Sequence, residues 1–190
     1  MRTRSLAALA LVLLLAGCTV STGSTTDASQ TTDVTVTIDG GLETDPIDGG
    51  RPVVLVAAAL GVPTEVFREA FSGVTPAGAG EEPDSAQVAL NKQALLDVLA
   101  PYGITNEQLD AASNFYRYNG SAGETWRHEA ATAVAVVTDG VVTRVTITNP
   151  GYGYSSTPTV TLSTGQHATA TLAFGQDTAA NGSISGISLD

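Results

Sequence analysis

Histidine, cysteine and acidic side chains are the usual components of catalytic and metal sites, and this chain places few of them at a useful spacing. His128 and His167 lie 39 residues apart, without a neighbouring cysteine or a His-x-x-x-His pattern, so we expect no metal site there. Asp39, Asp45 and Asp48 accompany glycines in turn sequences, at a spacing unlike that of a calcium loop. Because Gly-x-Ser-x-Gly is also absent, we predict no catalytic residue, no metal and no cofactor.

Carboxylates offer the one catalytic alternative, because a polymer hydrolase needs two of them in a cleft, one with a raised pKa. The candidates are Glu65, Glu69, Glu107, Asp110, Glu124 and Glu129. Sequence spacing does not decide which of them would pair. Solvated helix faces are the simpler interpretation, and we prefer it.

Aromatic residues are unevenly distributed along the chain. Seven of the ten lie between positions 102 and 154: Tyr102, Phe115, Tyr116, Tyr118, Trp126, Tyr152 and Tyr154. Such residues either fill a core between two halves of a protein or form a platform for sugar rings or an extended peptide. Core packing is the preferred interpretation. The candidate ligand-binding residues are Tyr118, Trp126, Tyr152 and Tyr154, and we expect the last two to be the most exposed.

The first 18 residues predict where the protein is located. A short basic start is followed by an apolar run at 6–16, which is too short to span a bilayer, and then by Leu-Ala-Gly-Cys18. This leader resembles the bacterial lipoprotein signal. The resemblance implies cleavage after residue 17 and attachment of acyl chains such as palmitate to Cys18, which would anchor the protein to a membrane of the cell envelope. Thr19 in place of an aspartate implies the outer membrane if the host is Gram-negative.

The charge of the chain excludes nucleic acid as a partner. The full chain has eight basic and 19 acidic residues, a formal charge of −11, and removal of the leader leaves −13. A chain this acidic repels phosphate backbones and has no basic patch to bind them.

The mature chain divides into a tether, a helical part and a β part. Residues 18–50 begin with a Ser/Thr-rich tether, in which 33–38 alternates like a short strand and is a candidate addition to the later sheet. Residues 51–127 predict four short helices, at 53–60, 64–71, about 85–99 and about 105–116. We expect Thr64 to cap the second of these, and Val88 to lie on the inner face of the third with Leu95, Leu96 and Leu99.

Residues 128–190 predict an antiparallel β subdomain. The stretch 145–162 alternates β-branched and polar residues at both ends, around a glycine–tyrosine corner at 149–154. Residues 139–147 resemble residues 181–189, and both segments begin with a dipeptide typical of a tight hairpin, Asp139-Gly and Asn181-Gly. The predicted fold class is therefore α+β, with about four helices followed by five or six strands in a sandwich or open barrel.

The helical part also resembles an uncharacterised domain of exported bacterial proteins. The similarity lies in LGVPTEVFREAFSGVTP at 60–76, YGITN at 102–106 and SNFYRY at 113–118, with a Gly-x-Gly-Tyr β segment after the helices. The resemblance would cover about 45–190 and implies no activity. We therefore expect a non-catalytic binding module, with an envelope protein or a glycan as its partner. The alternatives are the hydrolase above and a structural subunit of a surface assembly.

Overall fold

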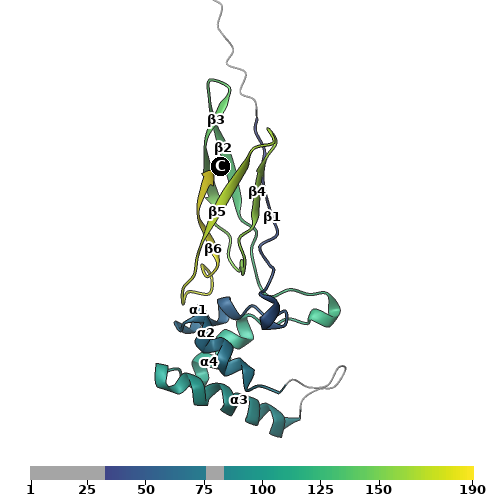
Figure 1. Ribbon diagram of the computed structural model, residues 1–190, viewed down its shortest axis with the longest axis vertical. Helices are drawn as coiled ribbons and strands as arrows, with labels where there is room; N and C mark the ends of the chain where they lie inside the picture. Colours follow the sequence, from purple (N-terminus) through teal and green to yellow (C-terminus); the bar gives the residue numbers. More distant parts are fainter. Residues whose placement is uncertain (1–32, 76–83) are drawn as a thin grey trace, which may run out of the picture. The chain divides into compact units, whose positions relative to one another are not determined.

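The computed structural model describes residues 33–75 and 84–190. Four α-helices precede most of the strands: α1 (Val53–Leu60), α2 (Thr64–Ser72), α3 (Ser85–Leu99) and α4 (Asn106–Phe115). The strands are β1 (Val36–Asp39), β2 (Thr132–Thr138), β3 (Val141–Asn149), β4 (Thr159–Leu162), β5 (His167–Ala173) and β6 (Ser183–Leu189). The predicted α+β class is confirmed (Figure 1). Cys18 lies outside the described residues, and none of the helices described is long and apolar enough to cross a membrane.

Local signals set the helix ends. Asp84 caps α3 by accepting from the Gln87 amide at 2.7 Å, and Thr105 forms a complete capping box at the start of α4. Gly61 ends α1 in the left-handed conformation, with φ 71°. The prediction for Thr64 was wrong, because Pro63 occupies the N-cap of α2 and Thr64 is its first helical residue.

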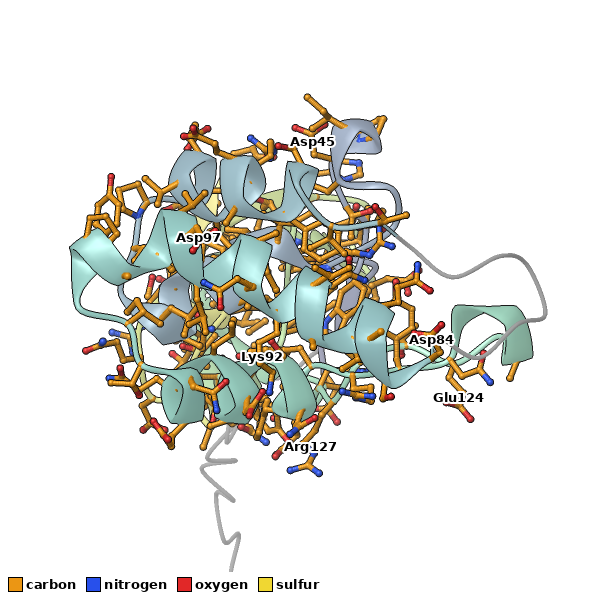
Figure 2. The ribbon with its side chains drawn as sticks, turned by 90° about the horizontal axis from the view of Figure 1, so that it is seen from below. Asp45, Asp84, Lys92, Asp97, Glu124 and Arg127 are labelled. Carbon is orange, nitrogen blue, oxygen red and sulfur yellow. The ribbon has the colours of Figure 1, made fainter. Side chains whose placement is uncertain are left out.

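The helices enclose a core of their own. α1 is apolar on most sides and contributes Val53, Leu55, Val56, Ala57 and Leu60 to it. α3 covers this core from outside, and Figure 2 shows Asp84, Lys92 and Asp97 spaced along it. Leu99 is fully buried, but Val88 is 46% exposed, so the prediction that Val88 faces inward was wrong. Its position near the start of α3 leaves it outside the group of side chains packed on the core.

The strands form two antiparallel layers. β1, β4, β5 and β6 make one sheet in the order β1-β4-β5-β6, and β2 pairs with β3 in the other. The predicted strand at 33–38 does add to the later sheet, since Val36 pairs with Leu162 and Ile38 with Val160. Side chains of both sheets share one core, which includes Val142 and Val145 of β3 and Val160 and Leu162 of β4. The six described strands therefore form a small sandwich, which was one of the two predicted forms.

The two similar segments begin differently in the structure. Asp139 and Gly140 have φ values of 52° and 77° and join β2 directly to β3, as the tight-hairpin pattern predicts. The prediction for Asn181 was wrong: it stands at the end of a nine-residue connection between β5 and β6, and its side chain is fully buried. This asparagine contacts the helices, so its place is decided by long-range packing and not by a local turn.

Candidate functional site

A cleft of about 310 Å³ opens in the helical part, between α1, α2 and the end of α4. Its lining residues are Arg51, Pro52, Val53, Val56, Phe67, Phe71, Ser113, Tyr116, Arg117 and Tyr118. Three- and four-residue spacings explain why these side chains meet, because positions i, i+3 and i+4 share one face of a helix. Val53 and Val56 come from one face of α1, and Phe67 and Phe71 from one face of α2. The floor is therefore apolar and aromatic.

Two arginines stand at this apolar cleft. The guanidinium carbon of Arg51 lies 4.5 Å from the centroid of the Phe71 ring, and an Nη of Arg117 donates to the Asn114 Oδ1 at 3.0 Å. Within residues 33–75 and 84–190, no carboxylate oxygen lies within 4.0 Å of either guanidinium. The described lining of the cleft also contains no acidic residue. In a chain of formal charge −11, this is a locally positive, apolar site.

Arg51 is held in place from two sides. On one side, Asp48 accepts two hydrogen bonds from Arg68 of α2, at 2.6 and 3.1 Å, and the Asp48 side chain is only 5% exposed. On the other side, the Tyr118 hydroxyl donates to the Gly50 carbonyl. The chain between these anchors passes through Gly49 and Gly50, which both have positive φ. The backbone immediately before Arg51 is thus tied both to α2 and to the segment after α4.

Tyr116 forms part of the cleft lining and of the helical core. Burial raises the pKa of its hydroxyl, an effect that the hydrogen bond from Asn181 opposes. The phenol is therefore neutral at physiological pH. It adds no charge to compete with the two arginines.

The four predicted ligand-binding aromatics do not form one surface. Tyr118 lines the cleft and stacks edge-on against Trp126, with ring centroids 5.5 Å apart. Trp126 itself is buried and donates from Nε1 to the Gly153 carbonyl at 2.8 Å. Tyr152 is half-buried, with its ring centroid 6.5 Å from that of Phe115. Tyr154 is 5% exposed and accepts from the Ala131 amide at 2.8 Å, so the expectation that it is exposed was wrong.

The glycine–tyrosine corner is buried because the glycines allow backbones to touch. A Cβ on Gly151 would lie 2.4 Å from the Glu129 carbonyl oxygen, and one on Gly153 would lie 2.8 Å from the Arg127 carbonyl oxygen. Both glycines have positive φ, 59° and 85°. The corner therefore packs against residues 127–131, and Tyr154 follows it into the β core.

Four of the six carboxylates considered for hydrolysis have separate partners. Asp110 pairs with Lys92 at 2.8 Å, and Glu65 lies beside Arg68 at 3.3 Å. Glu124 accepts from the Asn119 amide, and Glu129 from the Asn149 side chain at 2.6 Å. None of the six candidates lines the clefts described in the structure.

A smaller pocket beside the cleft contains two acidic residues. It has a volume of about 180 Å³ and is lined in part by Asp45, Asp48, Arg51 and Arg68. Arg68 contacts both carboxylates, Asp48 at 2.6 Å and Asp45 at 3.6 Å. The two carboxylates therefore share one guanidinium, and Asp48 is tied to it by two hydrogen bonds. In the described part of the chain, no group of three His, Cys, Asp or Glu side chains could hold a metal ion.

Sequence reasoning missed the arginines and phenylalanines of the cleft. Arg117 carried a signal, since it interrupts the aromatic run at 115–118. Phe67 and Phe71 are four positions apart, a spacing that indicates the buried face of a helix and does not distinguish core from cleft. Arg51 had no signal beyond its rarity in an acidic chain.

Comparisons with known proteins assign neither a family nor a function to this chain. No family model, no curated protein and no solved structure matches the chain. The similarity to an uncharacterised exported domain therefore stays a prediction.

Proposed function

We propose that this chain is a lipid-anchored protein of the cell envelope that binds a ligand, without turnover, in the cleft between α1, α2 and the end of α4. The observation that carries the binding site is the pair of arginines, Arg51 and Arg117, at an apolar cleft whose described lining holds no carboxylate. Arg51 is partly buried and Arg117 is exposed, so both guanidinium groups are reachable from solvent and can bind a partner of complementary charge beside the apolar lining. The anchor is proposed from the leader sequence and Cys18 alone.

Binding is preferred over hydrolysis for a geometric reason. A carboxylate pair must converge on one bond of the substrate, with the two groups roughly 5 to 10 Å apart in a cleft. Glu65 and Asp110 each face a cation, and the acidic pocket around Asp48 is occupied by the Arg68 guanidinium. The cleft itself offers arginines, phenylalanines and a neutral tyrosine.

The binding site can be tested on protein purified from its host envelope. Native mass spectrometry should detect a small molecule retained by the wild-type chain and absent from Ser113→Phe, whose larger side chain fills the cleft. Gln93→Phe, on the exposed face of α3, is the matched control and should retain the molecule. If all three proteins carry the same molecule or none of them carries any, the cleft is not the ligand site.

The anchor needs a separate test. Cys18→Ser should accumulate as an unprocessed precursor, because the hydroxyl is too weak a nucleophile to take the lipid. Mass spectrometry of the wild-type amino terminus should show acyl chains on Cys18. Normal maturation of the serine variant would exclude the lipoprotein assignment and leave the cleft test unaffected.

A further inference from the structure

We propose that the ligand of the cleft is a small amphiphilic carboxylic acid, with its carboxylate between Arg51 and Arg117 and its aryl or alkyl part on Phe67, Phe71 and the α1 valines. This inference rests on the proposed binding function and specifies its ligand. The charge, the hydrogen-bonding groups and the apolar walls of the cleft all favour such a ligand.

The charge of the lining selects an anion. Arg51 and Arg117 supply two positive charges, and within the described residues neither has a carboxylate partner. A guanidinium presents paired N–H groups that match the two oxygens of a carboxylate. The protein as a whole is strongly acidic and its net field repels anions, so a cleft that is lined by two arginines and by no described carboxylate is locally positive.

The hydrogen-bonding groups argue against a glycan in this cleft. Each hydroxyl of a bound sugar needs a hydrogen-bond donor or acceptor in the site. A hydroxyl that is desolvated without such a partner lowers the binding free energy substantially. Besides the arginines, the lining offers the side-chain hydroxyls of Ser113, Tyr116 and Tyr118. Tyr116 already accepts from Asn181 at 2.8 Å, and Tyr118 donates to the Gly50 carbonyl. Ser113 is the remaining neutral polar side chain.

The walls suit an apolar body attached to the anion. Val53, Val56, Phe67 and Phe71 present aliphatic and aromatic surface beside the guanidinium groups. The guanidinium carbon of Arg51 lies 4.5 Å from the centroid of the Phe71 ring, so charge and aromatic surface adjoin in one lining. The Asp48–Arg68 pair and the Tyr118–Gly50 hydrogen bond both hold the backbone that precedes Arg51, which reduces the ordering that this residue needs on binding.

Three probes that share the same apolar group and differ in their polar end test this assignment. The protein is the full chain as its host processes it, held in lipid nanodiscs if it carries the anchor. The probes are 3-phenylpropanoate, the neutral 3-phenylpropanamide and 3-phenylpropyl phosphate, measured by calorimetry and by the fluorescence of Trp126, the single tryptophan of the chain. We expect the carboxylate to bind about 10-fold or more tightly than the amide, as loss of charge-assisted hydrogen bonds predicts. Arg51→Gln and Arg117→Gln should each weaken carboxylate binding about 10-fold and leave amide binding unchanged. Arg144→Gln, an exposed arginine of β3, is the control and should have no effect.

The outcomes separate the two proposals. Equal binding of acid and amide, abolished in both by Ser113→Phe, would overturn the carboxylate assignment and retain the cleft as the ligand site. Tighter binding of the phosphate than of the carboxylate, or binding only when the carboxylate ends a peptide such as N-acetyl-glycyl-phenylalanine, would also overturn it. If no probe binds and the purified protein carries no ligand, both proposals fail.

Discussion

The side-chain amide of Asn181 donates to the Tyr116 hydroxyl at 2.8 Å, across 65 residues of sequence. The same amide nitrogen donates to the Leu55 carbonyl at 2.7 Å, and Asn181 Oδ1 accepts from the Gly175 amide at 3.2 Å. All three contacts belong to a residue with no exposed surface. One asparagine of the connection before β6 therefore joins α1 and α4 to the β sandwich.

Replacing Asn181 by alanine should destabilise the protein strongly. The substitution removes the partners of the Leu55 carbonyl and the Gly175 amide and leaves a cavity, so we expect a loss of at least about 2 kcal/mol in the free energy of unfolding. Urea denaturation followed by circular dichroism measures it. Gln93→Ala, which removes an exposed amide of α3, should cost less than about 0.5 kcal/mol. Similar losses in the two variants would show that Asn181 does not join the two parts.

Tyr116 should make stability depend on alkaline pH. Burial raises the pKa of its hydroxyl in the folded state, so its contribution is fully present below the pKa of an unfolded tyrosine, about 10. That contribution is lost as pH rises through the folded-state pKa. The difference in unfolding free energy between wild type and Tyr116→Phe should therefore be constant from pH 7 to 9 and shrink above pH 10. A constant difference up to pH 11 would contradict a buried, neutral phenol.

Gly182 and Gly140 provide a matched pair of glycine substitutions. Both have positive φ, 70° and 77°, so alanine at either position carries a backbone penalty of about 1 kcal/mol. At Gly182 the new Cβ would also lie 2.4 Å from the Tyr154 carbonyl oxygen, whereas at Gly140 nothing lies within 4 Å. Thermal unfolding should show a clearly larger loss for Gly182→Ala. Equal melting temperatures would mean that the backbone at 154 and 182 is not in close contact.

Tyr154 and Tyr152 should differ in their response to loss of the hydroxyl. Tyr154→Phe leaves the buried Ala131 amide without its acceptor, for an expected cost of about 1 to 3 kcal/mol. In the described structure the Tyr152 hydroxyl has no hydrogen bond, so Tyr152→Phe should change stability by less than about 0.5 kcal/mol. Chemical denaturation of both variants makes the comparison. The reverse order of effects would restore Tyr154 as an exposed residue of the corner.

The elements of this fold were predictable where their signals are local. The capping box at Thr105 fixes the start of α4 within four residues of sequence, and the Asp139-Gly140 turn fixes the β2–β3 hairpin. The strand before the helices was predictable from the alternation at 33–38. At Asn181 the prediction failed because a distant contact competes. Asn181-Gly182 is a hairpin-type dipeptide like Asp139-Gly140, but the Asn181 side chain donates to the Leu55 carbonyl of α1.

The candidate site was less predictable, because it depends on which faces of the helices and strands pack against each other. An aromatic residue has the same sequence signature whether it is buried or exposed. Trp126 and Tyr154 are buried because Gly151 and Gly153 allow the corner to approach residues 127–131. Tyr118 keeps one face at a cleft because α1 and α2 pack beside it.

The sequence alone determined the acidic character, the four helices and the alternating strands, because charge, period and capping act over a few residues. The leader before Cys18 stays a prediction. The tertiary structure decided which of these residues share a site. It placed Arg51, which precedes α1, and Arg117, which follows α4, at one cleft, although 66 positions separate them in the chain. Contacts at that separation depend on helix packing and on the burial of Asp48 against Arg68, and no local pattern encodes them.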